Sequence, residues 1–148
     1  MSIRLATRAV LLHQGRLLLV NAWADAAKSD LWCAPGGGAE PGASLPDNLA
    51  REVFEETGLR INVGLPCLIN EFHDPTRGFH QVEVFFRCTC DTDIIDPDWT
   101  DPEGVVTRHL WASAQDMAAL RVKPSSLALV AFSPQVALSY DALEWIQR

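Results

Sequence analysis

Three glutamates and a neighbouring arginine are the residues of this sequence best placed to do chemistry. Arg51 precedes Glu52, and two further glutamates, Glu55 and Glu56, follow three and four positions after Glu52. At the period of an α-helix, this spacing puts the three carboxylates on one side. Like charges so placed destabilise a helix by about 0.2–0.5 kcal/mol per pair, and a hard divalent cation would relieve the repulsion. The pattern predicts a Mg²⁺ or Mn²⁺ site; a solvated acidic helix face is the alternative interpretation.

A helix over residues 44–57 is expected to carry these side chains. Ser44 has the character of an N-terminal cap, and Gly58 supplies a stop signal. Residues 35–38 read Pro-Gly-Gly-Gly, which predicts a turn that lets the backbone pass close to a ligand. The glycines fit neither of two common phosphate-binding motifs, because the lysine of a Walker loop is missing and Pro41 interrupts the dinucleotide-binding pattern.

The segment resembles the motif of the Nudix (MutT-like) hydrolases, G-x5-E-x7-R-E-U-x-E-E-x-G-U, where U is a bulky apolar residue. Gly37 opens the motif, and residues 51–59 match its second half at every defined position. One position departs from it, because Ala43 stands where the motif has glutamate. Glu40, three residues earlier, is not a substitute by spacing. In the family the missing glutamate usually supports the motif's arginine, so the resemblance implies that the metal ligands are retained.

The resemblance implies an α/β fold, a Nudix-type α/β/α sandwich with a mixed β-sheet, in a single domain over residues 1–148. It also implies Mg²⁺- or Mn²⁺-dependent hydrolysis of the diphosphate linkage in a nucleoside diphosphate derivative. A nucleoside triphosphate, a nucleotide sugar and a dinucleoside polyphosphate all remain open as substrates. The alternative is a Nudix-fold module that binds a nucleotide or regulates without cleaving, which Ala43 keeps open.

Particular residues receive roles by the same resemblance. Glu52, Glu55 and Glu56 are the implied metal ligands, with the Gly37 carbonyl as a further one. Arg51 would orient Glu55 or its neighbours, which places it with the three glutamates in the catalytic group. Gly37 and Gly38 are implied to contact the substrate. The general base stays open, because the family draws it either from the helix or from a distant loop.

The segment 91–103 is a candidate for that distant loop. It holds six acidic residues, and Glu103 resembles the late acidic metal ligand of some Nudix enzymes. An EF-hand is excluded because Asp96 stands where that loop needs glycine. A solvated acidic loop is the alternative interpretation.

Composition narrows the class of protein. The chain has 148 residues, 48% of them hydrophobic, and a net charge of −7. That charge argues against nucleic-acid polymers and anionic membranes as partners, and favours a small nucleotide bound through a metal. No stretch predicts a leader or a membrane span, and the four cysteines lack a C-x-x-C pair, so we expect a cytoplasmic protein with reduced thiols. A homodimer stays open.

Hydrophobic periodicity and turn residues predict the remaining elements. Strands are expected at 3–12, 16–21, 31–34, 61–72, 79–90 and 105–111, and helices at 113–120, 125–132 and 139–148. Several side chains outside the motif are weaker candidates for substrate contact, and packing or solvent exposure is the alternative for each: Trp23, Trp32, Arg77, Phe79, Glu83 and Trp99.

Overall fold

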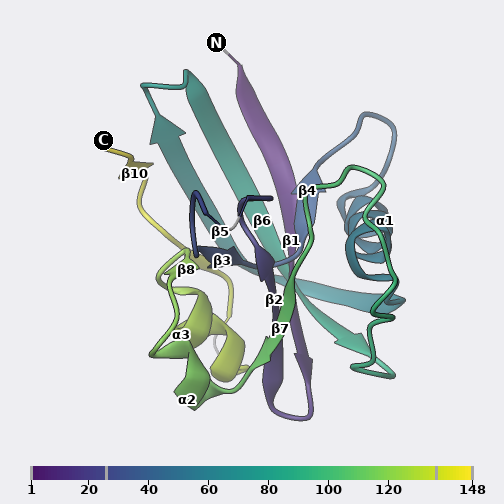
Figure 1. The fold of residues 1–148 in the computed structure, drawn as a ribbon. Helices are drawn as coiled ribbons and strands as arrows, with labels where there is room; N and C mark the ends of the chain where they lie inside the picture. Colours follow the sequence, from purple (N-terminus) through teal and green to yellow (C-terminus); the bar gives the residue numbers. More distant parts are fainter. Residues whose placement is uncertain (1, 26, 136, 148) are drawn as a thin grey trace.

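The computed structural model describes residues 2–25, 27–135 and 137–147. Figure 1 shows strongly twisted strands with a long helix on one side and two short helices on the other. In chain order the elements are β1 (Ile3–His13), β2 (Arg16–Asn21), β3 (Trp32–Cys33), β4 (Gly36–Gly38), α1 (Leu45–Thr57), β5 (Ile61–Asp74), β6 (Phe79–Cys90), β7 (His109–Ala112), α2 (Ala114–Met117), β8 (Val122–Lys123), α3 (Leu127–Phe132), β9 (Ser139–Tyr140) and β10 (Glu144–Trp145).

Strand β1 joins two groups of strands. Its residues 3–11 run parallel to β6, and residues 6–8 also pair antiparallel with β4. Its last residues pair with β2, which continues to β3 and β7. Strands β5 and β6 form the long antiparallel hairpin that the sequence predicts. The mixed pairing confirms the expected α/β fold.

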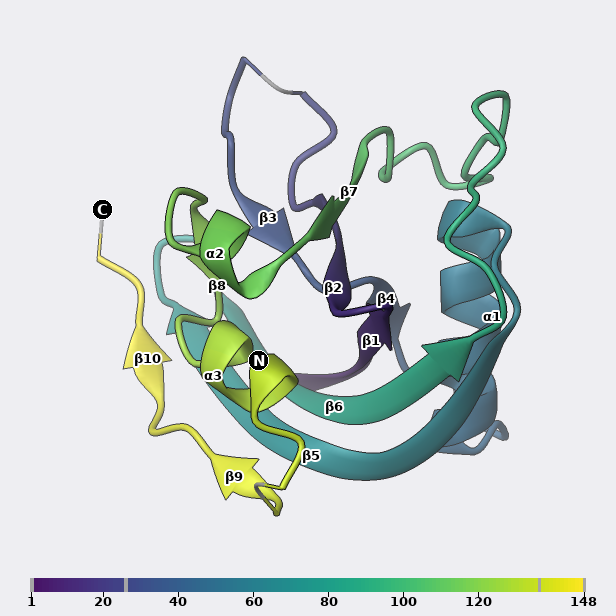
Figure 2. The same cartoon turned by 90° about the horizontal axis from the view of Figure 1, so that it is seen from below.

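Two clusters of buried side chains form the core. One packs α2 and α3 against β1, β2, β5 and β6, with Leu68, Phe85 and Leu127 among its fully buried members. The other packs Leu49 and Val53 of α1 against β1, β2 and β6. Figure 2 shows β5 and β6 as one curve with α1 near one end and the short helices near the other. The curvature lets one sheet serve both clusters.

The predicted helix over 139–148 is wrong. Its described residues include β9 and β10, which pair in parallel with β5; its last residue lies outside the described part of the chain. Asp141 donates its backbone N–H to the Ile69 carbonyl at 2.9 Å, and Ile146 donates to the His73 carbonyl at 2.9 Å. The exposed edge of β5 thus supplies partners that outweigh the local helical pattern.

Other elements differ in extent from the sequence prediction; the helix expected at 113–120, for example, is only the short α2 at 114–117. Residues 36–38 are not only a turn, because they form β4 against β1. The strand expected at 105–111 begins at His109, since backbone N–H groups before it bind side chains instead of a neighbouring strand. Asp101 accepts from residues 105 and 106, and Asn21 accepts from residues 107 and 108. Within the described residues, no helix has the length and apolar character needed to cross a bilayer.

Candidate metal centre

Helix α1 begins and ends where its capping residues predict. The Ser44 hydroxyl accepts a hydrogen bond from the Asp47 N–H at 3.2 Å, which satisfies one of the free donors of the first turn. Gly58 adopts a left-handed conformation, with φ of 76°, and donates its N–H to the Phe54 carbonyl. These two caps fix the ends of the helix, and burial of Leu49 and Val53 against the sheet sets which way the glutamates point.

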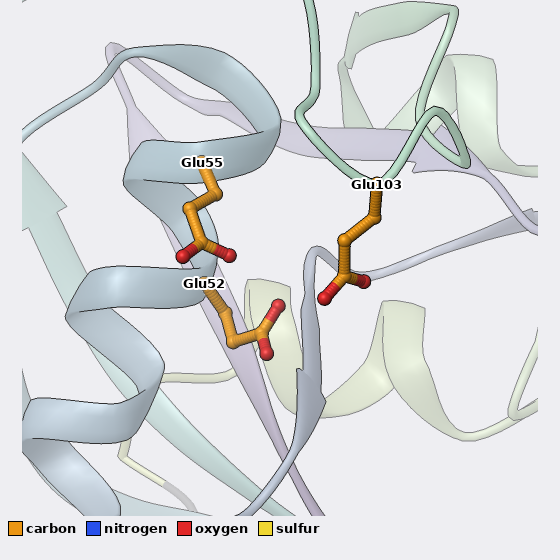
Figure 3. A group of neighbouring side chains, drawn as sticks. All are labelled: Glu52, Glu55 and Glu103. Carbon is orange, nitrogen blue, oxygen red and sulfur yellow. The ribbon is translucent and has the colours of Figure 1, made fainter.

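Three carboxylates meet at the side of α1. Glu52 and Glu55 project from the helix and Glu103 reaches them from the loop between β6 and β7 (Figure 3). One oxygen from each lies within 4.8 Å of the others. Oxygens bound to Mg²⁺ at about 2.1 Å lie up to about 4.2 Å apart, so a small side-chain movement closes the group on an ion. The all-oxygen donor set fits Mg²⁺ or Mn²⁺.

Glu103 is positioned by its own loop. The carboxylate of the buried Asp101 accepts the backbone N–H groups of Glu103 at 3.0 Å and Val106 at 2.9 Å. Trp99 in the same loop donates its indole N–H to the Glu55 carbonyl at 2.9 Å. The loop is therefore fastened to α1, and Glu103 lies beside the two glutamates of that helix.

The glycines of β4 permit a close approach between that strand and α1. A Cβ atom on Gly37 would lie 2.6 Å from the Glu52 carboxylate, a distance that side chains do not tolerate. Gly36 has a φ of +146°, and a Cβ there would lie 2.0 Å from the Thr7 carbonyl oxygen. The Gly36 N–H donates to Glu56 Oε2 at 3.0 Å. Glycine is thus required at position 36, where a Cβ would meet backbone, while a side chain at position 37 would displace the Glu52 carboxylate.

Glu56 stands apart from the other predicted ligands. Its side chain is buried beside Gly36, and it is not a member of the three-carboxylate group. Burial raises the pKa of Glu56 to about 8, although the Arg8 charge and the Gly36 N–H both favour the ionised form. Burial also raises the pKa of Glu52, with Glu103 and Glu55 adding repulsion and Arg51 opposing it. A bound cation would favour the ionised form of these carboxylates and reduce the repulsion between them.

Arg51 orients the carboxylates of α1. Its Nη1 donates to Glu55 Oε1 at 3.0 Å, and its Nη2 lies 3.3 Å from Glu52 Oε1. Glu40 Oε1 also lies 3.4 Å from Nη2. The spacing argument that Glu40 cannot replace the glutamate missing at Ala43 was therefore incomplete, because the loop brings Glu40 to the arginine from a different position.

A buried ion pair beside the site was missed by the sequence analysis. Arg8 Nε donates to Glu83 Oε2 at 2.7 Å, and Asn70 donates to Glu83 Oε1 at 3.1 Å. Arg8 Nη1 also donates to the carbonyls of Ala34, at 3.2 Å, and Gly36, at 3.3 Å. The alternation of β6 suggested that Glu83 could face the site, but nothing local indicated Arg8 as its partner.

The remaining candidates for substrate contact lie in different local environments. Trp99 packs edge-on against Phe54, so its role is to fasten the loop. The Arg77 guanidinium lies 5.4 Å from the ring centroids of both Trp23 and Phe79. The Gly38 carbonyl accepts a hydrogen bond from the Asn48 side-chain amide at 3.1 Å. The Arg4 guanidinium lies close to Gly38, where a Cβ atom would be. Trp32 lies under a different arginine, Arg108.

Comparison with known proteins identifies the family to which this chain belongs. A model described as the NUDIX domain matches residues 3–131, which is most of the chain. The chain belongs to the NUDIX family. The resemblance drawn from the motif is thereby confirmed, and the curled sheet around α1 is the NUDIX fold.

Individual relatives agree with this assignment. Nucleoside diphosphate-linked moiety X motif 6 of Mus musculus is 30% identical over 115 residues, covering 70% of this chain and 34% of that protein. Diphosphoinositol polyphosphate phosphohydrolase 3-beta of Bos taurus is 31% identical over 87 residues, covering 59% of this chain and 50% of that protein. The chain thus spans between a third and a half of the length of these relatives.

Solved structures share the fold. A NUDIX hydrolase from Nitrosomonas europaea superposes with a TM-score of 0.75 at 20% identity, covering 93% of each chain. The MutT protein from Bacillus halodurans superposes with a TM-score of 0.67 at 20% identity, covering 93% of this chain and 86% of that one. At such identities the likeness establishes the architecture alone.

Proposed function

We propose that this NUDIX protein is a Mg²⁺- or Mn²⁺-dependent pyrophosphohydrolase that cleaves the diphosphate linkage of a nucleoside diphosphate derivative. The observation that carries the proposal is the meeting of Glu52, Glu55 and Glu103 from two segments far apart in sequence. Support also comes from the names of similar proteins, which include phosphohydrolases and an ADP-ribose pyrophosphatase from Streptococcus suis with a TM-score of 0.66.

The residues divide the work of such a reaction. Glu52, Glu55 and Glu103 would hold the divalent ion, and the Gly37 carbonyl and Glu56 are further candidate ligands. When bound, the ion supplies positive charge for the phosphate oxygens and lowers the pKa of a nucleophilic water. Arg51 keeps two of the carboxylates oriented by its contacts with Glu52 and Glu55.

The chain's own charge explains why a cation is needed. The net charge of −7 opposes the approach of a polyphosphate, and the carboxylate group adds repulsion at the point of reaction. Gly37 lets β4 approach the Glu52 carboxylate closely, and Gly38 lets it approach the Arg4 guanidinium; both glycines remain candidates for substrate contact. A small nucleotide is the proposed partner. A homodimer and a cytoplasmic location remain predictions.

Product analysis tests the proposal. Nucleoside triphosphates, nucleotide sugars and dinucleoside polyphosphates would be incubated with the protein and Mg²⁺ or Mn²⁺, and the release of phosphate, pyrophosphate and nucleoside monophosphate measured. We expect cleavage of at least one class, lost on chelation and lost in Glu55→Gln. Asp98→Asn, in the same loop as Glu103 but outside the carboxylate group, is the matched control and should retain the rate.

The same assay addresses the alternative of a non-cleaving module. Ala43 favours that alternative, whereas the contact of Glu40 with Arg51 supplies a carboxylate near the arginine. Metal-dependent nucleotide binding without any product would contradict the hydrolase and support the binding module.

A further inference from the structure

Arg108, directly before β7, carries donors that no described residue satisfies. Its Nε and Nη2 atoms are buried, and among the described residues neither finds a hydrogen-bond acceptor. None of the ion pairs within the described part of the chain includes Arg108. A guanidinium is always protonated, so burial without an acceptor leaves an uncompensated charge. Such an arrangement calls for an acceptor from outside the chain.

The backbone around Arg108 is held in place. The Asn21 side-chain oxygen accepts the N–H groups of Thr107 and Arg108, each at 2.9 Å. The Arg108 carbonyl accepts the Asn21 N–H at 3.3 Å. Asn21 is itself buried, with 2% of its surface exposed. The root of the Arg108 side chain therefore has a defined position on the β2 side of the sheet.

The side chain is also held in place, by Trp32. The central carbon of the guanidinium lies 5.4 Å from the Trp32 ring centroid, within the range of a cation–π contact. Trp32 packs against the core cluster that also contains Leu110 and Ala112 of β7. Through Trp32, Arg108 lies beside the face of the sheet that carries Leu110 and Ala112. That face packs toward β1, β5 and β6.

On β6, the carboxylate of Glu83 is not available to Arg108. Phe85 of β6 shares the core cluster with Leu110, and Glu83 lies two residues before Phe85 on the same face. Glu83 is occupied, because one of its oxygens accepts from Arg8 and the other from Asn70. Glu83 therefore supplies no acceptor to Nε and Nη2 of Arg108.

We propose that Arg108, stacked on Trp32, binds an anionic group of the substrate through Nε and Nη2. Two N–H groups on one edge of a guanidinium match two oxygens of a phosphoryl or carboxylate group. The inference rests on the proposed function and specifies how that substrate is held. Arg108 is five positions after Glu103, so their Cα atoms are at most about 18 Å apart. One nucleotide derivative can therefore reach both.

Two sources of the anion share this chemistry. Arg108 contacts either the diphosphate that is cleaved or a second anionic group on the moiety attached to it. Two pairs of compounds distinguish these sources: UDP-glucose with UDP-glucuronate, which adds a carboxylate, and NADH with NADPH, which adds a phosphate. Binding would be measured by calorimetry, and turnover with Mg²⁺ in parallel.

The decisive variant is Arg108→Met, which keeps the length of the stem and removes the donors. If the diphosphate is the target, dissociation constants for all bound compounds rise by roughly 10- to 100-fold, the effect of losing charge-assisted hydrogen bonds. If a second anion is the target, only UDP-glucuronate or NADPH weakens. Unchanged constants for every compound, or a wild-type protein that binds none of the four, would overturn the inference.

Further variants separate binding from folding. Arg108→Lys keeps the charge but loses the paired donors, so we expect an intermediate loss. Arg121→Gln, at an exposed arginine paired with Asp30, is the matched control and should bind like the wild type. Thermal unfolding of Arg108→Met should occur at or above the wild-type temperature, because an unsatisfied charge is removed. A marked fall would indicate a structural arginine and contradict the proposal.

The two proposals fail separately. Binding that depends on Arg108, with no product from any compound, would contradict hydrolysis and leave the anion contact intact. Product formation that is unchanged in Arg108→Met would support hydrolysis and contradict the anion contact.

Discussion

The group of three carboxylates at α1 carries unbalanced negative charge, whereas the charges of the buried ion pair between β1 and β6 cancel. Glu52, Glu55 and Glu103 gather negative charge around a single arginine, Arg51. Arg8 and Glu83, in contrast, neutralise each other and leave no oxygen of Glu83 without a donor. We infer that the unbalanced region is kept for binding an ion and the balanced one for holding the strands together.

The largest expected effect comes from breaking the unbalanced region. Glu52→Gln should lower Mg²⁺-dependent turnover by more than about 100-fold, because even residues that only support a metal ligand contribute about 10–100-fold. The free energy of unfolding without metal should not fall, since one of three repelling charges is removed. Turnover assays and denaturant titrations check both parts. A stability loss with retained turnover would reverse the roles assigned to the two regions.

Breaking the balanced region should affect stability instead. Glu83→Gln leaves the Arg8 charge without its partner and should lower the free energy of unfolding by about 3 kcal/mol. Urea denaturation measures this loss. Glu144→Gln removes one member of the exposed pair with Lys123 and should cost less than about 1 kcal/mol, which makes it the matched control. Equal losses in the two variants would show that the buried pair contributes no more to the free energy of unfolding than the exposed pair.

A smaller effect is expected where β4 touches the carboxylate group. Gly37→Ala places a methyl group against the Glu52 carboxylate and should raise the Mg²⁺ concentration for half-maximal turnover by about tenfold. Metal titration of the rate measures the shift. Gly78→Ala, in open space at the tip of the β5–β6 hairpin, has a positive φ that Gly37 lacks, but should leave the metal requirement unchanged. A similar shift in both variants would indicate general backbone strain.

The smallest effect should come from Glu40→Gln. The side chain of Glu40 is 64% exposed, so its pair with Arg51 is screened by solvent. Turnover should change by less than about fivefold, the factor equivalent to an exposed ion pair of about 1 kcal/mol. Steady-state kinetics measure this change in turnover. A much larger loss would show that Glu40 takes over the support that the residue at position 43 does not provide.

The amino-acid sequence by itself determined helix α1, its caps and the shared direction of its glutamates. These features depend on residues a few positions apart, and local spacing describes them well. The β5–β6 hairpin was predictable for the same reason, since its alternation and turn are local signals. The family followed from one uninterrupted run, residues 51–59.

Only the tertiary structure decided which distant groups meet. Glu103 joined the carboxylate group through its loop, Glu56 stood apart from it, and Arg8 found Glu83 from 75 residues away. Residues 139–140 and 144–145 became strands because β5 offered an unpaired edge, and Nε and Nη2 of Arg108 remained without an acceptor among the described residues. Strand register and competition for hydrogen-bond partners govern these outcomes, and neither is a local property of the chain.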